Sequence, residues 1–358
     1  MSKKYRNSRV PFDDKFVNSR FDFCKNLKWF LIAPAVIILT GLIILCAIGF
    51  NLGIDFTGGS TMTIYVDKDG HYGEQYDIKN LNKIEGAVQA VLDEHGLKIT
   101  TIQTTTMDVE TLGIEKGDAV IVKYQNNNKL STDEITEIND DIRAALRTKF
   151  GYNDEGEEKL VEYGGVTTAS ASAELMMKSF IALLVAVVLI LVYVAFRFEL
   201  TAGLAAILAL FHDVLLTASV VLICRVQINV SFIAALITIL GYSINNTIII
   251  FDRMRNDLKA ARAANERIDN NKVANEAVKG TMLRSILTGI TTFIMILMIT
   301  LIGVADIREF AFPIMIGILA GFYSSVFITP GLWAIAYKPK RRKKISKSEV
   351  VEAETEEN

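Results

Sequence analysis

Four hydrogen-bonding side chains interrupt a long apolar run in the second half of the chain. The stretch "LGYSINNTIIIFDRMR", residues 240–255, contains Ser243, Asn245, Asn246 and Thr247. Hydroxyl and amide groups both donate and accept hydrogen bonds, but none of them titrates near neutral pH. Because a polar group among apolar ones is costly unless it is paired, these four side chains need partners on other segments.

An ionisable pair, His212-Asp213, lies near the middle of another apolar run, twelve residues from both Leu200 and Arg225. A carboxyl group at the centre of a bilayer is expensive unless it is paired, so it indicates a functional site. The alternative is structural: Asp213 forms a hydrogen bond between helices and is either neutral or capped by His212.

Three further charged residues flank these runs. Asp252 and Arg253 follow the asparagine pair, and an ion pair between them at the membrane interface is their ordinary interpretation. Arg284 opens the next apolar run, so it could reach the depth of Asn245 and Asn246. It could equally be a surface anchor whose charge extends into water.

The apolar runs predict six membrane-spanning helices. The chain has 358 residues, of which 51% are hydrophobic. Runs of about 20 residues suffice to cross a bilayer, where only helices and closed barrels satisfy their own backbones. Residues 1–29 hold eight Lys/Arg and lack the short leader of a removable signal peptide, so the first span is expected to stay as an anchor. The expected spans are 30–50, 179–196, 200–224, 228–251, 285–304 and 310–337.

The distribution of Lys and Arg predicts the orientation, because cytoplasmic segments carry more of them. With six spans, all the basic segments fall on one side, so both termini are predicted to be cytoplasmic. The intervening external segment has 23 acidic and 12 basic residues, and no nucleic-acid-binding pattern is visible. The predicted organisation is a basic tail (1–29), the first helix (30–50), an extracellular or periplasmic domain (51–178), helices two to six (179–337, with a cytoplasmic loop at 252–284) and a charged cytoplasmic tail (338–358).

The external segment shows the order strand-helix-strand-strand-helix-strand, which is typical of a ferredoxin-like domain. Its second helix opens with Ser131 and Glu134 at the spacing of a capping box. The fold class is therefore predicted as a mostly α membrane protein with six transmembrane helices and one α+β ferredoxin-like external domain between helices 1 and 2. No catalytic motif is visible, and the three cysteines and three histidines lack metal-ligand spacing, so no enzyme activity, metal or cofactor is predicted.

Two glycine patterns complete the set of motifs. In "NLGIDFTGGS", Gly58 and Gly59 allow a helix to give way to a strand, Gly53 precedes them, and Asp55 can accept hydrogen bonds from backbone amides. In the last span, "GILAGFYSS" contains a G-x-x-x-G followed by two serines, a pattern that lets helices approach closely.

Together these strings resemble the SecD/SecF family of the bacterial Sec protein-export machinery, and within it the SecF type, which is grouped with RND-type transporters. "GIDFTGGS" is similar to the family signature after span one, and "GYSINNTIIIFDRMRN" to its fourth span. Further similar strings are "AFRFEL", "HDV", "LRSILTGITT" and "FAFPIMIGILAGFYSSVFI". The ordered matches cover nearly the whole chain.

The resemblance implies an accessory subunit of the Sec translocase that uses an ion gradient to assist late protein export. Its implied partners are a SecD-like subunit, the Sec channel and the exported unfolded polypeptide. The family carries an Asp that relays protons where this chain has Asn246, so the inferred ion-pathway residues are Asp213, Asn245, Asn246, Asp252 and Arg284. The alternatives are a scaffold of the Sec complex that uses no ion gradient, or a half-size RND-type exporter of a small molecule or lipid.

Overall fold

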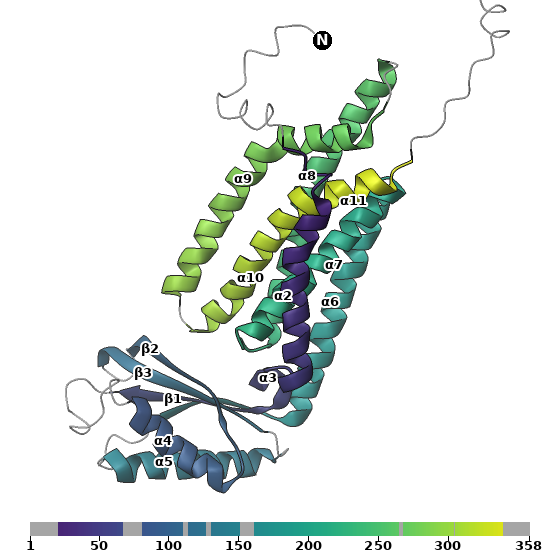
Figure 1. Cartoon of the computed structure of the whole chain (residues 1–358). Helices are drawn as coiled ribbons and strands as arrows, with labels where there is room; N and C mark the ends of the chain where they lie inside the picture. Colours follow the sequence, from purple (N-terminus) through teal and green to yellow (C-terminus); the bar gives the residue numbers. More distant parts are fainter. Residues whose placement is uncertain are drawn as a thin grey trace, which may run out of the picture.

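Six long apolar helices and one small sheet domain make up the protein (Figure 1). The computed structural model describes residues 21–66, 81–109, 114–126, 130–150, 161–264, 268–303 and 305–338. Within these ranges, six helices are long and apolar enough to cross a membrane. The predicted number of spans and the predicted fold class are therefore confirmed.

The spanning helices are longer than the apolar runs alone indicated. Both sides of the expected loop at 252–284 are helical, and only the short connection from 264 to 269 separates them. Apolar patterning marks where a helix enters hydrocarbon and does not mark where its hydrogen bonding ends, so the polar extensions were missed. The helices are α2 (Leu27–Ile48), α6 (Ala169–Arg197), α7 (Leu200–Ile223), α8 (Val230–Ala263), α9 (Asn270–Ile302) and α10 (Ala305–Tyr323), which continues through the π-helix η5 (Ser324–Ile328) into α11 (Thr329–Ala336).

Side-chain caps fix where several of these helices start. Thr168, Asn229 and Asp269 precede α6, α8 and α9, and their side-chain oxygens accept backbone N–H groups of the first turn. These are the residue types that satisfy the unpaired amides of a helix N-terminus. The starts of three helices are thus encoded locally.

The helices divide into an inner and an outer group. In α7, α8 and the α10–α11 segment, half or more of the most apolar stretch is buried inside the chain, whereas little of that stretch is buried in α2, α6 and α9. A polar side chain on the buried side of an inner helix must consequently find its partners within this chain.

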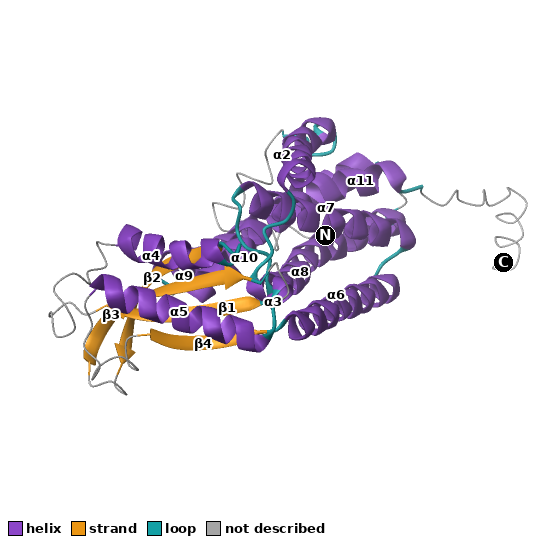
Figure 2. Cartoon of the chain, turned by 90° about the horizontal axis from the view of Figure 1, so that it is seen from below, coloured by secondary structure: helices purple, strands orange, loops and turns teal. Residues whose placement is uncertain are grey.

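The domain between α2 and α6, called the external domain after its predicted position, contains a four-stranded antiparallel sheet in the order β2-β3-β1-β4. Helices α4 and α5 cover the face that points away from the bundle (Figures 1 and 2). The chain order and the strand order are those of the ferredoxin-like fold, as predicted. The elements are α3 (Ile54–Thr57), β1 (Gly59–Val66), α4 (Leu81–Glu94), β2 (Ile99–Val109), β3 (Ile114–Gln125), α5 (Thr132–Phe150) and β4 (Val161–Thr167).

The core of this domain lies between the sheet and its two helices, where Met62 and Val122 pack against Ile84 and Ile138. The capping box is present, since Ser131 N donates to Glu134 Oε2 at 2.7 Å and Glu134 N donates to Ser131 Oγ at 3.3 Å. The backbone N–H and the hydroxyl of Ser131 both donate to the Glu134 carboxylate, and these two hydrogen bonds lower the pKa of Glu134 because they favour its ionised form.

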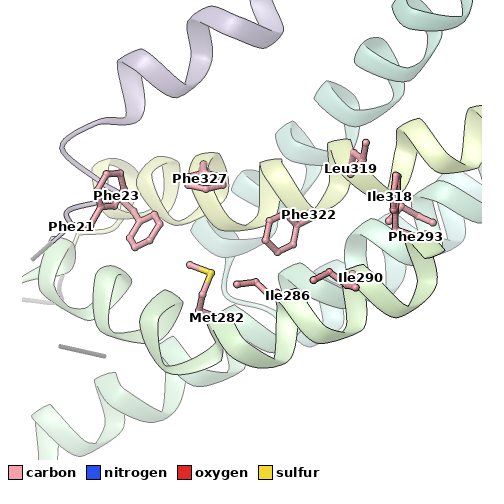
Figure 3. A pocket seen from close by; sticks show the side chains of 11 residues that line it. Phe21, Phe23, Met282, Ile286, Ile290, Phe293, Ile318, Leu319, Phe322 and Phe327 are labelled. Carbon is pink, nitrogen blue, oxygen red and sulfur yellow. The ribbon is translucent and has the colours of Figure 1, made fainter. Parts of the chain in front are cut away.

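An apolar cavity of about 670 Å³ lies between parts of α9 and α10 (Figure 3). Side chains such as Ile290 and Phe293 of α9 and Phe322 of α10 line it, and Phe23 closes one end. All the residues that line it are apolar, so the cavity could hold an apolar group but has no side chain that would hydrogen-bond to a ligand.

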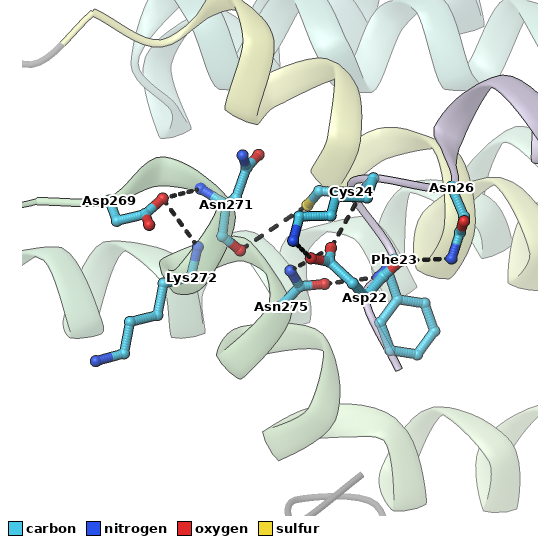
Figure 4. Close-up of polar contacts among 9 residues, drawn as sticks. Asp22, Phe23, Cys24, Asn26, Asp269, Asn271, Lys272 and Asn275 are labelled. Carbon is cyan, nitrogen blue, oxygen red and sulfur yellow. Dashed lines mark hydrogen bonds and ion pairs between the residues drawn. The ribbon is translucent and has the colours of Figure 1, made fainter. Parts of the chain in front are cut away.

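The residues that precede α2 fold against the start of α9 (Figure 4). Asn275 Nδ2 donates to Asp22 Oδ1 at 2.8 Å. Burial acts to raise the pKa of Asp22, but hydrogen bonds from Asn275 and Lys25 outweigh it, and the pKa is lowered. Burial, with the carboxylates of Asp22 and Asp269 nearby, raises the pKa of the Cys24 thiol to about 12. Cys24 is therefore held as an unreactive thiol.

Candidate functional site

A buried carboxylate lies where three elements of the inner bundle meet. Asp213 of α7 has no exposed surface. Its Oδ2 accepts a hydrogen bond from Ser243 Oγ of α8 at 2.5 Å and another from Ser324 Oγ of η5 at 2.8 Å. The structure thus places a carboxyl group inside the bundle, hydrogen-bonded to two other elements.

The other carboxylate oxygen contacts the neighbouring histidine. His212 Nδ1 lies 2.9 Å from Asp213 Oδ1, within hydrogen-bond distance. His212 Nε2 and Thr217 Oγ1 are buried polar atoms without a hydrogen-bond partner in the described part of the chain. Asp213 thus contacts His212 within its own helix and also forms hydrogen bonds to Ser243 and Ser324 on other elements.

A second hydroxyl pair extends this polar cluster along α8. Thr247 Oγ1 and Ser325 Oγ lie 2.9 Å apart, and both side chains are buried. Ser324 and Ser325 are adjacent, yet one contacts α7 and the other contacts α8. The π-helix η5 begins at Ser324, and such insertions are frequent at functional sites.

Glycines of the last span allow the close contact on which the cluster depends. A Cβ built on Gly321 would lie 2.9 Å from the Cβ of Ser243, and one on Gly317 would overlap the side chain of Ile239. Any side chain at these two positions would push α10 away from α8. The G-x-x-x-G pattern therefore brings α10 and the following serines into reach of Asp213.

The asparagine pair lies on a different side of α8. Asn245 is exposed, and Asn246, partly buried, accepts a hydrogen bond from Ser285 Oγ of α9 at 2.8 Å. Arg284 is exposed and forms no hydrogen bond or ion pair with the described residues. The residue that contacts the asparagine is thus Ser285, the neighbour of the arginine expected there.

Asp252 forms a different ion pair from the one expected. Its Oδ1 lies 3.0 Å from Nη2 of Arg197, the last residue of α6, and 2.7 Å from Arg255 Nη2. Arg253 pairs instead with Asp257, one helical turn away. The predicted Asp252–Arg253 pair is therefore wrong, because adjacent residues of a helix do not face each other.

The glycine-rich segment after α2 attaches the external domain to the start of α8. Gly53 N donates to Ile228 O at 2.9 Å, and Val230 N donates to Asp55 Oδ2 at 3.2 Å. Val230 is the first residue of α8, so a carboxylate accepts one of the free amides at that helix N-terminus. Gly58 and Gly59 have φ values of 78° and 148°, and a side chain on Gly59 would collide with the Tyr124 carbonyl. These positions require glycine.

The connection between α7 and α8 also contacts the sheet and α10. Gln227 Nε2 donates to Thr101 Oγ1 of β2 at 2.5 Å. Glu309 of α10 accepts from Asn229 at 2.7 Å and from Gln103 of β2 at 3.4 Å. A displacement of the sheet would consequently reach the N-terminal end of α8 directly.

Two residues of these sites carry weak sequence signals. Thr217 lies four residues after Asp213, so it shares a helix face with it. Ser285 follows the more conspicuous Arg284. Neither a threonine nor a serine in an apolar segment is distinctive, because hydroxyls there usually bond to their own helix backbone.

The family profile described as "Protein export membrane protein SecD/SecF, C-terminal" matches residues 155–339. This match spans more than half of the chain and contains the whole Asp213 cluster. The chain belongs to the SecD/SecF family of protein-export membrane proteins. With its six spans it is a multi-pass membrane protein. A second profile, the SecD/SecF GG motif, matches residues 43–69 and includes the attachment to α8.

Relatives in the SecD/SecF family come in two lengths. A protein translocase subunit SecF of Calditerrivibrio nitroreducens is 32% identical, and the match covers 88% of this chain and 93% of that protein. A protein translocase subunit SecDF of Thermus thermophilus is 29% identical over 91% of this chain but only 40% of its own length. The crystal structure of a translocon-associated SecDF from Thermus aligns with a TM-score of 0.65 and 28% identity, over 88% of this chain and 38% of that one.

Proposed function

We propose that the chain is an accessory subunit of a Sec translocase, in which ion movement through the inner bundle assists late stages of protein export. The observation that carries this proposal is the carboxyl group of Asp213, buried where α7, α8 and η5 meet. A charge at this depth is expensive, and such charges mark ion or substrate pathways. The names of the SecF and SecDF relatives support the export role.

The proposed partner is a SecD-like subunit that covers one side of α8. Ala234, Thr238, Gly241 and Asn245 are all exposed and recur at helical spacing, so they form one face, here called the α8 outer face. Small and polar residues on a spanning helix allow another helix to pack closely. SecDF relatives are more than twice as long as the matched part, so in them more chain is available to cover this face.

Coupling between ion and polypeptide is proposed to run through α8. Its middle carries Ser243, which binds Asp213, and its first residue is held by Asp55 of the glycine-rich segment. A charge that crosses the membrane releases about 2.3 kcal/mol per 100 mV. That energy is sufficient to shift a domain between two arrangements that differ by a few kcal/mol. The external domain, together with the Sec channel, would then hold or release the emerging unfolded polypeptide.

Among the candidate ion-pathway residues, Asp213 is the proposed carrier of charge. Asn246 cannot titrate, and Asp252 is paired with two arginines at the end of its span. Asn245 and Arg284 are proposed to meet the partner subunit. A scaffold that uses no ion gradient is the second candidate, and the amide at Asn246 favours it.

The proposed orientation has both termini in the cytoplasm and the domain of residues 51–178 outside. We expect a cysteine placed at Glu85, on the exposed side of α4, to react with an impermeant maleimide in intact cells. A cysteine at Asn256, at the opposite end of the bundle, is expected to react only after lysis. The reverse pattern would overturn the topology.

The functional test compares two carboxylate-to-amide changes in inverted membrane vesicles. Asp213→Asn is expected to abolish the stimulation of export by an ion gradient, because it removes the buried charge. Asp252→Asn, the matched control, is expected to retain most of it. Export is measured after the proton and sodium gradients are collapsed separately. Equal export with and without both gradients would favour the scaffold.

A further inference from the structure

We propose that the hydroxyl groups around Asp213 form a binding site for one Na⁺ ion. The site consists of the Asp213 carboxylate and the hydroxyls of Thr217, Ser243 and Ser324. Sodium binding by this chain stands on the geometry alone, whereas its use to drive export rests on the proposed function.

The site offers only oxygen atoms. Ser243 and Ser324 approach Asp213 from α8 and η5, so three different elements supply ligands. Carboxylate and hydroxyl oxygens suit hard cations, and softer metals prefer sulfur or imidazole nitrogen. The π-helix η5 supplies one of these ligands, and such insertions are frequent at functional sites.

Thr217 is the observation that points to a missing ligand. Its side chain has no exposed surface, and its Oγ1 has no hydrogen-bond partner among the described residues. A buried hydroxyl without a partner is destabilising. Thr217 lies one helical turn beyond Asp213 on the same buried face of α7, so an ion beside the carboxylate would use its free oxygen.

The charge of the site selects a monovalent ion. Asp213 is the one acidic side chain among the four proposed ligands. Among the described residues, no lysine or arginine pairs with Asp213, and no group of three acidic, histidine or cysteine side chains could hold a metal ion. A divalent ion would leave an unbalanced charge in a buried site, which is costly. One Na⁺ neutralises the carboxylate.

Binding requires only small movements. A hydroxyl has one donor and two lone pairs and can rotate about its C–O bond. Ser243 and Ser324 now donate to the carboxylate, and each still has lone pairs for a cation on the same side. The close packing at Gly321 holds these oxygens together before the ion arrives.

The test uses the full chain purified in mild detergent, with ²²Na⁺ as the probe and choline to keep ionic strength constant. We expect saturable binding of one Na⁺ per chain and a rise in Tm of a few degrees in NaCl relative to choline chloride. Thr217→Val removes one ligand without breaking any hydrogen bond of the ion-free protein. It should therefore leave Tm in choline unchanged or higher, and weaken Na⁺ binding about tenfold.

Two further variants complete the comparison. Ser324→Ala is expected to weaken binding, whereas Ser285→Ala, which removes a hydroxyl outside the cluster, should bind Na⁺ like the parent chain. No saturable binding by the parent chain, or equal binding by the Thr217→Val variant, would overturn the site. Because these measurements involve no export, Na⁺ binding with unimpaired export in Asp213→Asn vesicles would refute the coupling and leave the site intact.

Discussion

Helix α8 carries two polar faces that differ in how their hydrogen bonds are satisfied. On the inner face, Ser243 and Thr247 are buried and bond to Asp213 and Ser325 of this same chain. On the α8 outer face, Asn245 is exposed, and Arg284 of the adjacent α9 has no partner among the described residues. The inner face is complete within the chain, whereas the outer face is not.

The difference follows from the cost of polar groups in hydrocarbon. An amide or a guanidinium that faces lipid is expensive, so it persists only where another chain or water covers it. We therefore infer that the inner cluster is an internal property of this chain and that the outer face is one half of an interface. Substitutions on the two faces should separate folding from assembly.

The largest effect is expected from Gly321→Val, which attacks the inner face. Its side chain would overlap Ser243 and force α10 away from α8, since a Cβ alone would lie 2.9 Å from the Ser243 Cβ. Overpacking of this kind costs about 1–3 kcal/mol of stability. A fall in Tm of the detergent-purified chain, together with loss of export, is the expected result.

A matched glycine in the external domain supplies the control. Gly86 on α4 is exposed, and a Cβ at this position would have no neighbouring atom within 4 Å, so Gly86→Ala should stabilise the domain slightly. If Gly321→Val did not lower Tm, α8 and α10 would not be in close contact at Ser243.

The next largest effect is expected from Gly241→Leu on the outer face. Nothing in the described part of the chain lies within 4 Å of a Cβ at this position, so the Tm of the chain alone should not change. Recovery of the partner subunit in a mild-detergent pull-down should fall severalfold, because a large residue separates closely packed helices. Normal recovery would mean that this face contacts lipid.

A moderate effect is expected from Arg284→Ala. If the arginine pairs with the partner, its loss should slow export a few-fold without lowering the amount of the chain in membranes. Lys272→Ala removes an exposed cation in the first turn of the same helix. It serves as the control and should leave the export rate unchanged. Equal, mild effects of both changes would identify Arg284 as a surface anchor.

The fold could be predicted because its signals are local or periodic. Apolar runs showed six spans, alternation of strands and helices showed the sheet domain, and the spacing of Ser131 and Glu134 showed a helix start that the structure confirms. The helical ends of α8 and α9 were missed because their residues are polar, so helix continuity there does not show in hydropathy.

The arrangement of the site could be predicted only in part. A carboxylate in an apolar run stands out, and Asp55 was expected to accept a backbone amide, as it does from Val230. The meeting of Ser324 with Asp213 depends on the π-helix and on the approach of two helices 111 residues apart in sequence. No local pattern encodes that contact. Ser285 was overlooked for the same reason, since its partner Asn246 lies on another helix.

The smallest effect is expected from Asn246→Asp, although the resemblance to the family implies an Asp at this position. A carboxylate has nearly the same shape as the amide and can accept the same hydrogen bond from Ser285 Oγ, so packing should be preserved. The new group would titrate, but the cluster that holds a buried charge in this chain surrounds Asp213, on the other face of α8. We therefore expect export in inverted vesicles to change less than about threefold, well below the tenfold change that about 1.4 kcal/mol of barrier produces. The measurement is made with the proton and sodium gradients collapsed in turn. A strong gain of proton-driven export in this variant, together with normal export by Asp213→Asn, would move the coupling site from the inner face of α8 to the side that contacts α9.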